Sequence, residues 1–300
     1  MKRIVTASAV TVLAVGLLSG CTSEETPTET TPAGADVRSE FSQELHDALP
    51  EDIKEAGVVS VAGETNQPWR VVDADGEVSG LGEDILAELS AVLGVEFKTE
   101  LVTGLPAVKL GFQSGRNDIG AGPLLITETT KKDVTFIEYL QGRPGIVTPA
   151  AEPVEAMLDL CGATVAYLDG SNAWAAIFDT LDGRCVEAGE PNVERLPLAD
   201  INAAILAVES GRADAAGVGA HQSAYTAQER PEKFSNYIAT REEWTSDLLG
   251  MGFEVNNLEL AEAVQAAWQE IFDNGVYADL MEQYGLTEIM VEKPVLHIGG

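Results

Sequence analysis

Histidine and cysteine are the side chains here best able to bind a metal or act as nucleophiles, and the chain has few of them. The histidines are His46, His221 and His297, and none stands at metal-ligand spacing from another histidine or from a cysteine. The sequence also lacks Gly-rich phosphate-binding loops, a GxSxG element and an HExxH motif. We therefore expect no metal, no cofactor and no catalytic residues.

The chain is strongly acidic. Its 300 residues include 49 Asp and Glu but only 18 Lys and Arg, which gives a formal net charge of −31. Such a surface repels phosphate backbones, so nucleic acid is excluded as a partner, and anionic membrane surfaces are equally unfavourable. Because 45% of the residues are hydrophobic, the chain has enough apolar side chains for one large domain or two ordinary ones.

The first residues have the pattern of an export signal. Lys2 and Arg3 precede an apolar stretch, residues 4–18, that is too short for a comfortable membrane span. Residues 17–20, Leu-Leu-Ser-Gly, followed by Cys21, resemble the bacterial lipobox. That resemblance implies that residues 1–20 are a lipoprotein signal peptide, that Cys21 carries lipid, and that the protein is extracytoplasmic and membrane-anchored. The alternative is an ordinary signal peptide with an incidental cysteine.

A flexible tether is expected over residues 21–37, which are mostly Thr, Glu and Pro. Removing residues 1–20 takes away two basic residues and no acids, so the formal charge becomes −33. Export also implies an oxidising compartment, where we expect Cys161 and Cys185 to form a disulfide. Closing the loop between them would stabilise the fold by about 3 kcal/mol. The alternative is two buried free thiols.

Strands and helices alternate through the rest of the chain. Short apolar runs predict strands at residues 58–62, 95–101 and 163–168. Apolar residues at helical spacing predict helices at residues 83–93, 172–181, 200–210 and 258–272. Gly94 is expected to end the first helix and Ser171 to cap the second.

A short internal repeat indicates two similar halves. The pattern Ser-Gly-Arg-x-Asp occurs at residues 114–118 and 210–214, and each copy follows a predicted helix and precedes a strand of small residues. Two α/β lobes are therefore expected. Ligands of such folds bind at the carboxyl ends of the strands, which here is the cleft between the lobes.

Several segments together resemble the extracytoplasmic solute-binding proteins of ABC importers, in the polar amino acid branch. The similarity runs from about residue 49 to residue 285. The segments that carry it are Pro68-Trp69, residues 73–84, residues 113–118, Ile126-Thr127, residues 160–171, residues 210–215 and residues 274–277.

The resemblance implies an α/β, two-lobe periplasmic-binding-protein-like fold of type II with two hinge crossovers. We expect these crossovers near residues 140–143 and 246–250. Lobe 1 would comprise residues 38–141 and the return segment 250–300, and lobe 2 residues 142–249. One solute would be trapped between the lobes when they close.

Two charged positions of the family pattern are neutral here. The family's arginine for the α-carboxylate falls three residues after Thr127, at Thr130, and its aspartate for the α-ammonium falls at Gly219. A zwitterion enclosed without the arginine and the aspartate would incur a desolvation penalty of several kcal/mol. Either other residues supply the charges, or the solute is different.

The candidate ligand-binding residues lie mainly in predicted loops and at a helix start. They are Glu64, Asn66, Trp69, Thr127, Arg143, Ser171, Asn172 and Trp244. Arg143 is a possible replacement cation at the first crossover, and the free N–H groups beside Ser171 favour a carboxylate. Simple packing, solvation or helix capping would explain the same residues without a ligand. By contrast, Trp174 and Trp268 lie on apolar helix faces and are expected in the core.

The expected protein is a monomeric, lipid-anchored solute-binding protein that delivers an amino acid or similar solute to an ABC permease. One alternative is a binder of an amine, a quaternary ammonium compound or a compatible solute, held between Trp69 and Trp244 by cation–π contacts. Another is a dehydratase-type enzyme on the same fold, which the missing carboxylate-binding arginine disfavours. We expect no enzymatic activity.

Overall fold

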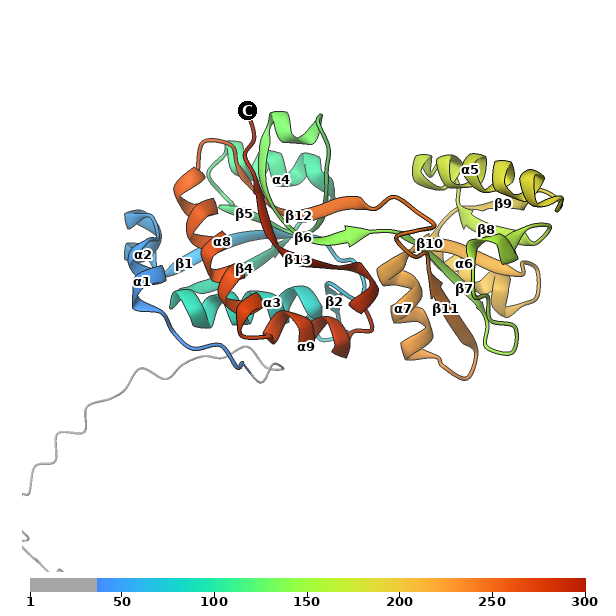
Figure 1. Ribbon diagram of the computed structural model, residues 1–300. Coiled ribbons are helices and arrows are strands. Elements are labelled where there is room, and N and C mark those ends of the chain that lie inside the picture. Colours follow the sequence, from blue (N-terminus) through green and yellow to red (C-terminus); the bar gives the residue numbers. More distant parts are fainter. Residues whose placement is uncertain (1–36) are drawn as a thin grey trace, which may run out of the picture. The chain divides into compact units, whose positions relative to one another are not determined.

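The computed structural model describes residues 37–300 (Figure 1). The predicted signal peptide (1–20), Cys21 and all but the last residue of the predicted tether (21–37) lie outside the described residues. Over residues 37–300, no helix is both long and apolar enough to cross a membrane.

The first sheet has the strand order β13-β6-β12-β5-β1-β4. Its strands are β1 (Val58–Gly63), β4 (Glu96–Leu101), β5 (Ile119–Ile126), β6 (Val134–Gly142), β12 (Asp247–Glu254) and β13 (Met290–His297). β1 runs parallel to β4 and β5, whereas β12 and β13 pair antiparallel with β6. The return of the chain as β12 and β13 therefore completes a sheet that began some 190 residues earlier, at β1.

Helices cover both faces of the first sheet, because successive strand residues point to opposite sides. Val61 of β1 and Ile137 of β6 pack against α3 (Leu81–Leu93), α8 (Leu258–Asp273) and α9 (Val276–Gln283). Ala62 and Phe136, which are adjacent to Val61 and Ile137 in their strands, pack on the other side with α4 (Gly104–Gln113). Figure 1 shows α4 apart from α3, α8 and α9.

The second sheet has the order β11-β7-β10-β8-β9. Its strands are β7 (Pro144–Pro149), β8 (Thr164–Leu168), β9 (Glu194–Leu198), β10 (Ala215–Gly219) and β11 (Phe234–Ile238). Ile146 and Val165 pack toward α5 (Asn172–Ala188), whereas the next residues, Val147 and Ala166, pack toward α6 (Ile201–Glu209). This sheet is thus also sandwiched between helices.

The remaining elements of the described residues are one further helix, α7, and several short helices and strands. They are α1 (Gln43–Asp47), α2 (Glu51–Ala56), β2 (Val71–Val72), β3 (Val78–Ser79), η1 (Thr130–Lys132), η2 (Met157–Leu160), α7 (Ala220–Glu229) and η3 (Thr287–Ile289).

The predicted helices are confirmed, and one of them is longer than predicted. Helix α3 ends at Gly94, whose φ of 65° is the left-handed conformation that glycine adopts most easily. Helix α5 is capped by Ser171 but continues to Ala188, beyond the predicted end at residue 181. The polar Asp-Gly-Arg at residues 182–184 resembles a turn. The apolar stripe nevertheless continues to Cys185, which is fully buried.

The two Ser-Gly-Arg-x-Asp segments perform the same task in the two sheets. The backbone N–H of Asp118 donates to the carbonyl of Ser60, and its carboxylate accepts from the Ser60 N–H at 2.7 Å. Asp214 makes the same pair of bonds with Thr164, also at 2.7 Å for the carboxylate. Each aspartate therefore fixes the start of one strand against its neighbour, and the inferred internal repeat is structural.

The chain passes between the sheets through two connections. β6 ends at Gly142 and β7 begins at Pro144, so Arg143 is the first connection. β11 ends at Ile238 and β12 begins at Asp247, so the second connection is residues 239–246, just before most of the range predicted. The division into lobe 1 (38–141 and 250–300) and lobe 2 (142–249) remains a proposal.

A disulfide joins Cys161, directly after η2, to Cys185 of α5, as predicted. Its cysteines are 24 residues apart in sequence. Closing a loop of that length in the unfolded chain lowers its entropy and raises the free energy of unfolding by about 3 kcal/mol. We expect the double variant C161A/C185A to melt roughly 5–10 °C lower. The measurement is thermal unfolding by circular dichroism, with and without dithiothreitol. A reductant that lowers the Tm of the double variant as much as that of the wild type would contradict this assignment.

Candidate functional site

The loop after β1 contains three of the predicted residues, of which two are partly exposed and one is buried. Glu64 and Asn66 are partly exposed, and Asn66 forms a backbone bridge with Arg70. Trp69, by contrast, is only 1% exposed and belongs to the hydrophobic cluster beneath α3 and α8. Core packing therefore accounts for most of the Trp69 side chain. Trp174 and Trp268 are also buried, as predicted.

Trp69 nevertheless lies against a strand of the first sheet and against α7, a helix that packs on the second sheet. Its ring lies edge-on to Tyr139 of β6, at 6.1 Å between centroids, and 6.1 Å from the ring of His221 at the start of α7. Its indole Nε1 is buried and has no hydrogen-bond partner among residues 37–300. Trp69 thus lies where α7 of the second sheet meets the core of the first.

Arg70 is a buried cation that the sequence reasoning missed. It is fully buried, donates from Nε to Glu83 at 2.5 Å and from Nη1 to the Ala121 carbonyl at 2.9 Å. Gly63, the last residue of β1, makes room for it, since a Cβ there would lie 2.6 Å from Nη1. The glycine at the strand end and the acidic residue in the first turn of α3 were the available signals. The side chain links β5 to α3, and we assign it a structural role.

Thr127 and Thr130 bond to each other. The Thr130 hydroxyl accepts from the Thr127 N–H at 2.9 Å and lies 3.0 Å from the Leu125 carbonyl, to which it donates. The Thr127 hydroxyl accepts from the Thr130 N–H at 3.1 Å. These bonds stabilise the turn into η1. The capping alternative therefore explains both threonines, and the neutral Thr130 offers no charge for a carboxylate.

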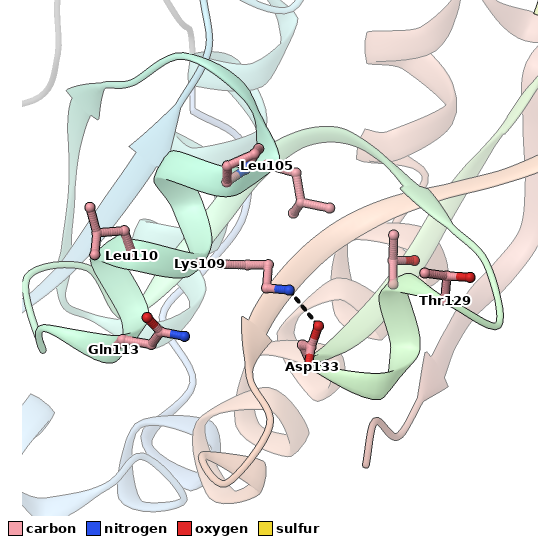
Figure 2. A pocket seen from close by; sticks show the side chains of 8 residues that line it. Leu105, Lys109, Leu110, Gln113, Thr129 and Asp133 are labelled. Atoms are coloured by element: carbon pink, nitrogen blue, oxygen red, sulfur yellow. Dashed lines mark hydrogen bonds and ion pairs between the residues drawn. The ribbon is translucent and has the colours of Figure 1, made fainter. Parts of the chain in front are cut away.

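A pocket of about 560 Å³ lies between α4 and η1 (Figure 2). It is lined by Leu105, Pro106, Lys109, Leu110, Gln113, Thr129, Thr130 and Asp133. Lys109 points across it and forms an ion pair with Asp133. The pocket contains none of the predicted ligand-binding residues, and its lysine is already paired.

Arg143 occupies the first connection and is 5% exposed. Its Nη1 donates to the carbonyl of Ala239, in the second connection, at 2.7 Å. Its Nε and Nη2 are buried and have no partner among the described residues. Burial lowers the pKa of this guanidinium, and the nearby carboxylate of Glu288 raises it. A buried cation with two donors that have no partner among the described residues is thus present at the first connection.

The predicted residues of the second lobe belong to α5 and its surroundings. Ser171 caps α5 by accepting the Trp174 N–H at 3.3 Å, and Asn172 is the first residue of the helix. Trp244 packs on the cluster beneath α5, with the guanidinium of Arg184 5.3 Å from its ring centroid. Trp244 and Trp69 therefore belong to different hydrophobic clusters, and no ring contact joins them in the part of the chain described.

Gly219, at the family's ammonium-binding position, caps α7. Its N–H donates to the Gln222 side chain at 3.0 Å. His221 follows two residues later, and burial lowers the pKa of its imidazole to about 4. Its Nε2 has no partner among residues 37–300. Sequence reasoning set His221 aside because it had no metal-ligand spacing, and residues 37–300 contain no group of His, Cys, Asp and Glu side chains arranged to hold a metal.

The structure thus brings together only part of the predicted set. Trp69 contacts His221, and the N–H of Ala220, next to His221, donates to the Arg143 carbonyl at 3.0 Å. Trp69 and Arg143 are thus linked through residues 220 and 221 at the start of α7. Thr127 lies at η1 and Ser171 and Trp244 at α5, where each has a local structural partner.

The chain belongs to the bacterial extracellular solute-binding proteins, family 3, which match residues 58–287. It is 26% identical to the arginine-binding protein ArgT of Corynebacterium glutamicum over 261 residues, which cover 85% of this chain and 83% of that protein. The family is one of extracytoplasmic proteins that bind small solutes, so the expected class of protein is confirmed.

Solved structures share the two-lobe α/β fold. An ancestral cationic amino acid solute-binding protein has a TM-score of 0.66 at 22% identity, covering 78% of this chain and 98% of that one. The second substrate-binding domain of Lactococcus lactis GlnP, in an open conformation, has a TM-score of 0.63 at 19% identity, covering 76% and 95%. The predicted fold class, a two-lobe periplasmic-binding-protein-like fold, is therefore confirmed.

The lowered pKa of His221 makes stability depend on pH in a specific range. Between pH 6.5 and about 4, the imidazole is protonated in the unfolded chain but neutral in the native one. Stability therefore falls as the pH drops through this range, by roughly 3 kcal/mol from this residue alone. We expect the His221→Gln variant to lose less stability than the wild type between pH 7 and pH 4.5. The measurement is urea unfolding across that range, and parallel losses in the two proteins would contradict the assignment.

Proposed function

We propose that this protein captures an amino acid or a closely similar solute outside the cytoplasm and delivers it to the permease of an ABC importer. The observation that carries the proposal is the architecture of a family 3 chain, with two sheets joined only at Arg143 and at residues 239–246 over the described residues. Two such connections permit a hinge motion that a bound solute stabilises. One site between two lobes needs no second copy, so we expect a monomer that binds without catalysis.

An amino acid is favoured over the amine alternative by two observations. A cation–π cage would need the rings of Trp69 and Trp244 to contact the same solute. The two rings instead pack in separate hydrophobic clusters, and Arg184 already lies over Trp244. The similarity to an arginine-binding protein supports amino acids, with cationic ones to be tested first.

A titration calorimetry screen tests the solute class. We expect at least one L-amino acid to bind the chain in the calorimeter. When present at a hundred times its dissociation constant, that amino acid should stabilise the folded protein by about 2.7 kcal/mol, which a separate thermal melt would show as a Tm several degrees higher. The amine that lacks only the carboxylate of that amino acid is the matched control and should bind far more weakly. Binding confined to amines or quaternary ammonium compounds would overturn this assignment.

We further propose that lipid at Cys21 anchors the protein to the membrane after residues 1–20 are removed. The lipobox-like residues 17–20 and the polar residues 22–36 support this proposal. In cells fed a labelled fatty acid, the wild type should carry label and fractionate with membranes, whereas the Cys21→Ser variant should be unlabelled and released. If both proteins are unlabelled and released, Cys21 is an incidental residue.

A further inference from the structure

Within residues 37–300, three buried polar atoms without partners belong to residues 141 and 143, at the first connection: Gln141 Oε1 and Arg143 Nε and Nη2. Trp69 Nε1 and His221 Nε2 are likewise buried without a partner among those residues. Arg143 and Gln141 are two residues apart. The ring of Trp69 contacts that of His221, whose neighbour Ala220 donates to the Arg143 carbonyl. Unpartnered buried polar atoms are few in native proteins because each is costly, so a group of them at one place needs an explanation.

The guanidinium of Arg143 is held in one orientation. Nη1 donates to the Ala239 carbonyl at 2.7 Å, which ties the first connection to the second. The Ala239 N–H in turn donates to the carbonyl of Pro144 at 3.0 Å. The two remaining groups, Nε and Nη2, form one edge of the planar guanidinium, with two parallel N–H donors. This edge matches the two oxygens of a carboxylate.

No acidic side chain of the described residues hydrogen-bonds this edge. Glu288 and Glu242 are close enough to raise the pKa of Arg143, and Arg241 is close enough to lower it, but neither carboxylate hydrogen-bonds Nε or Nη2. A buried cation left without a partner is strongly unfavourable, whereas a bidentate carboxylate would satisfy both donors at once. The edge is therefore suited to a carboxylate that comes from outside the chain.

We propose that the Nε–Nη2 edge of Arg143 binds the α-carboxylate of the solute, a role that Thr130 cannot perform. The proposal rests on the proposed function, because it names the group that recognises an amino acid. Gln141 Oε1, two residues before Arg143 and also without a partner among the described residues, adds an acceptor suited to the α-ammonium. Because the edge is buried here, the carboxylate reaches it when the lobes move apart about the two connections.

The test uses the full-length chain and the amino acid that binds best in the calorimetric screen. Arg143→Met should weaken binding of that amino acid at least 30-fold, since it removes both donors of a buried charge pair. Arg143→Lys keeps the charge but not the two-donor edge, and should still weaken binding about 10-fold or more. Arg116→Met, at an exposed arginine paired with Glu100, is the matched control and should bind as the wild type does.

The decarboxylated amine distinguishes loss of the carboxylate contact from general damage. Its affinity should be the same for the wild type and for the Arg143 variants, so only the amino acid loses affinity. Thermal unfolding reports whether each variant is folded. Should Arg143→Met not fold, Arg143→Lys decides, because its Nζ can still donate to the Ala239 carbonyl.

Three results would have different meanings. If the wild type binds an amino acid and both folded Arg143 variants bind it equally well, the carboxylate assignment is overturned while the proposed function stands. If the wild type binds no amino acid at all, the proposed function itself fails. Equal losses for the amino acid and the amine would also overturn the assignment, because they would show a purely structural role for Arg143.

Discussion

The single constraint on which the rest of the structure depends is that the chain must pass between its two sheets and return. The two passages are adjacent and are bonded to each other, through Arg143 to the Ala239 carbonyl and through the Ala239 N–H to Pro144. The return passage brings β12, β13, α8 and α9 back to the first sheet, and each sheet has helices on both faces. The cost of the arrangement is a buried arginine whose remaining donors find no partner within the described chain.

Much of the architecture follows from local sequence. Apolar spacing located α3, α6 and α8, and Gly94 and Ser171 correctly marked the end and the start of helices. The repeated Ser-Gly-Arg-x-Asp pattern indicated two similar halves because its aspartates make short-range strand contacts in both. These features depend on residues close in sequence or on one neighbouring strand, so a sequence pattern can predict them.

The site was harder to predict, since burial of polar residues depends on contacts between distant segments. Arg143 was singled out only from its position at a crossover, and its bond to Ala239 spans 96 residues. Arg70 and His221 were missed because their partners, Ala121 and Trp69, lie far away in the chain. Thr127 and Ser171 matched a family position and a helix start, yet their oxygens serve local turns. Sequence spacing alone does not distinguish a hydroxyl that caps a turn from one that faces a solute.

The disulfide has a mechanical consequence. Cys161 and Cys185 both lie between the two connections, so the bond braces η2 against α5 without spanning either passage. Oxidation therefore reinforces one half of the molecule internally and adds no covalent bond between the halves. A covalent bond placed across the connections would have tied the two halves together instead. The covalent reinforcement is thus confined to one half and would be lost there under reducing conditions.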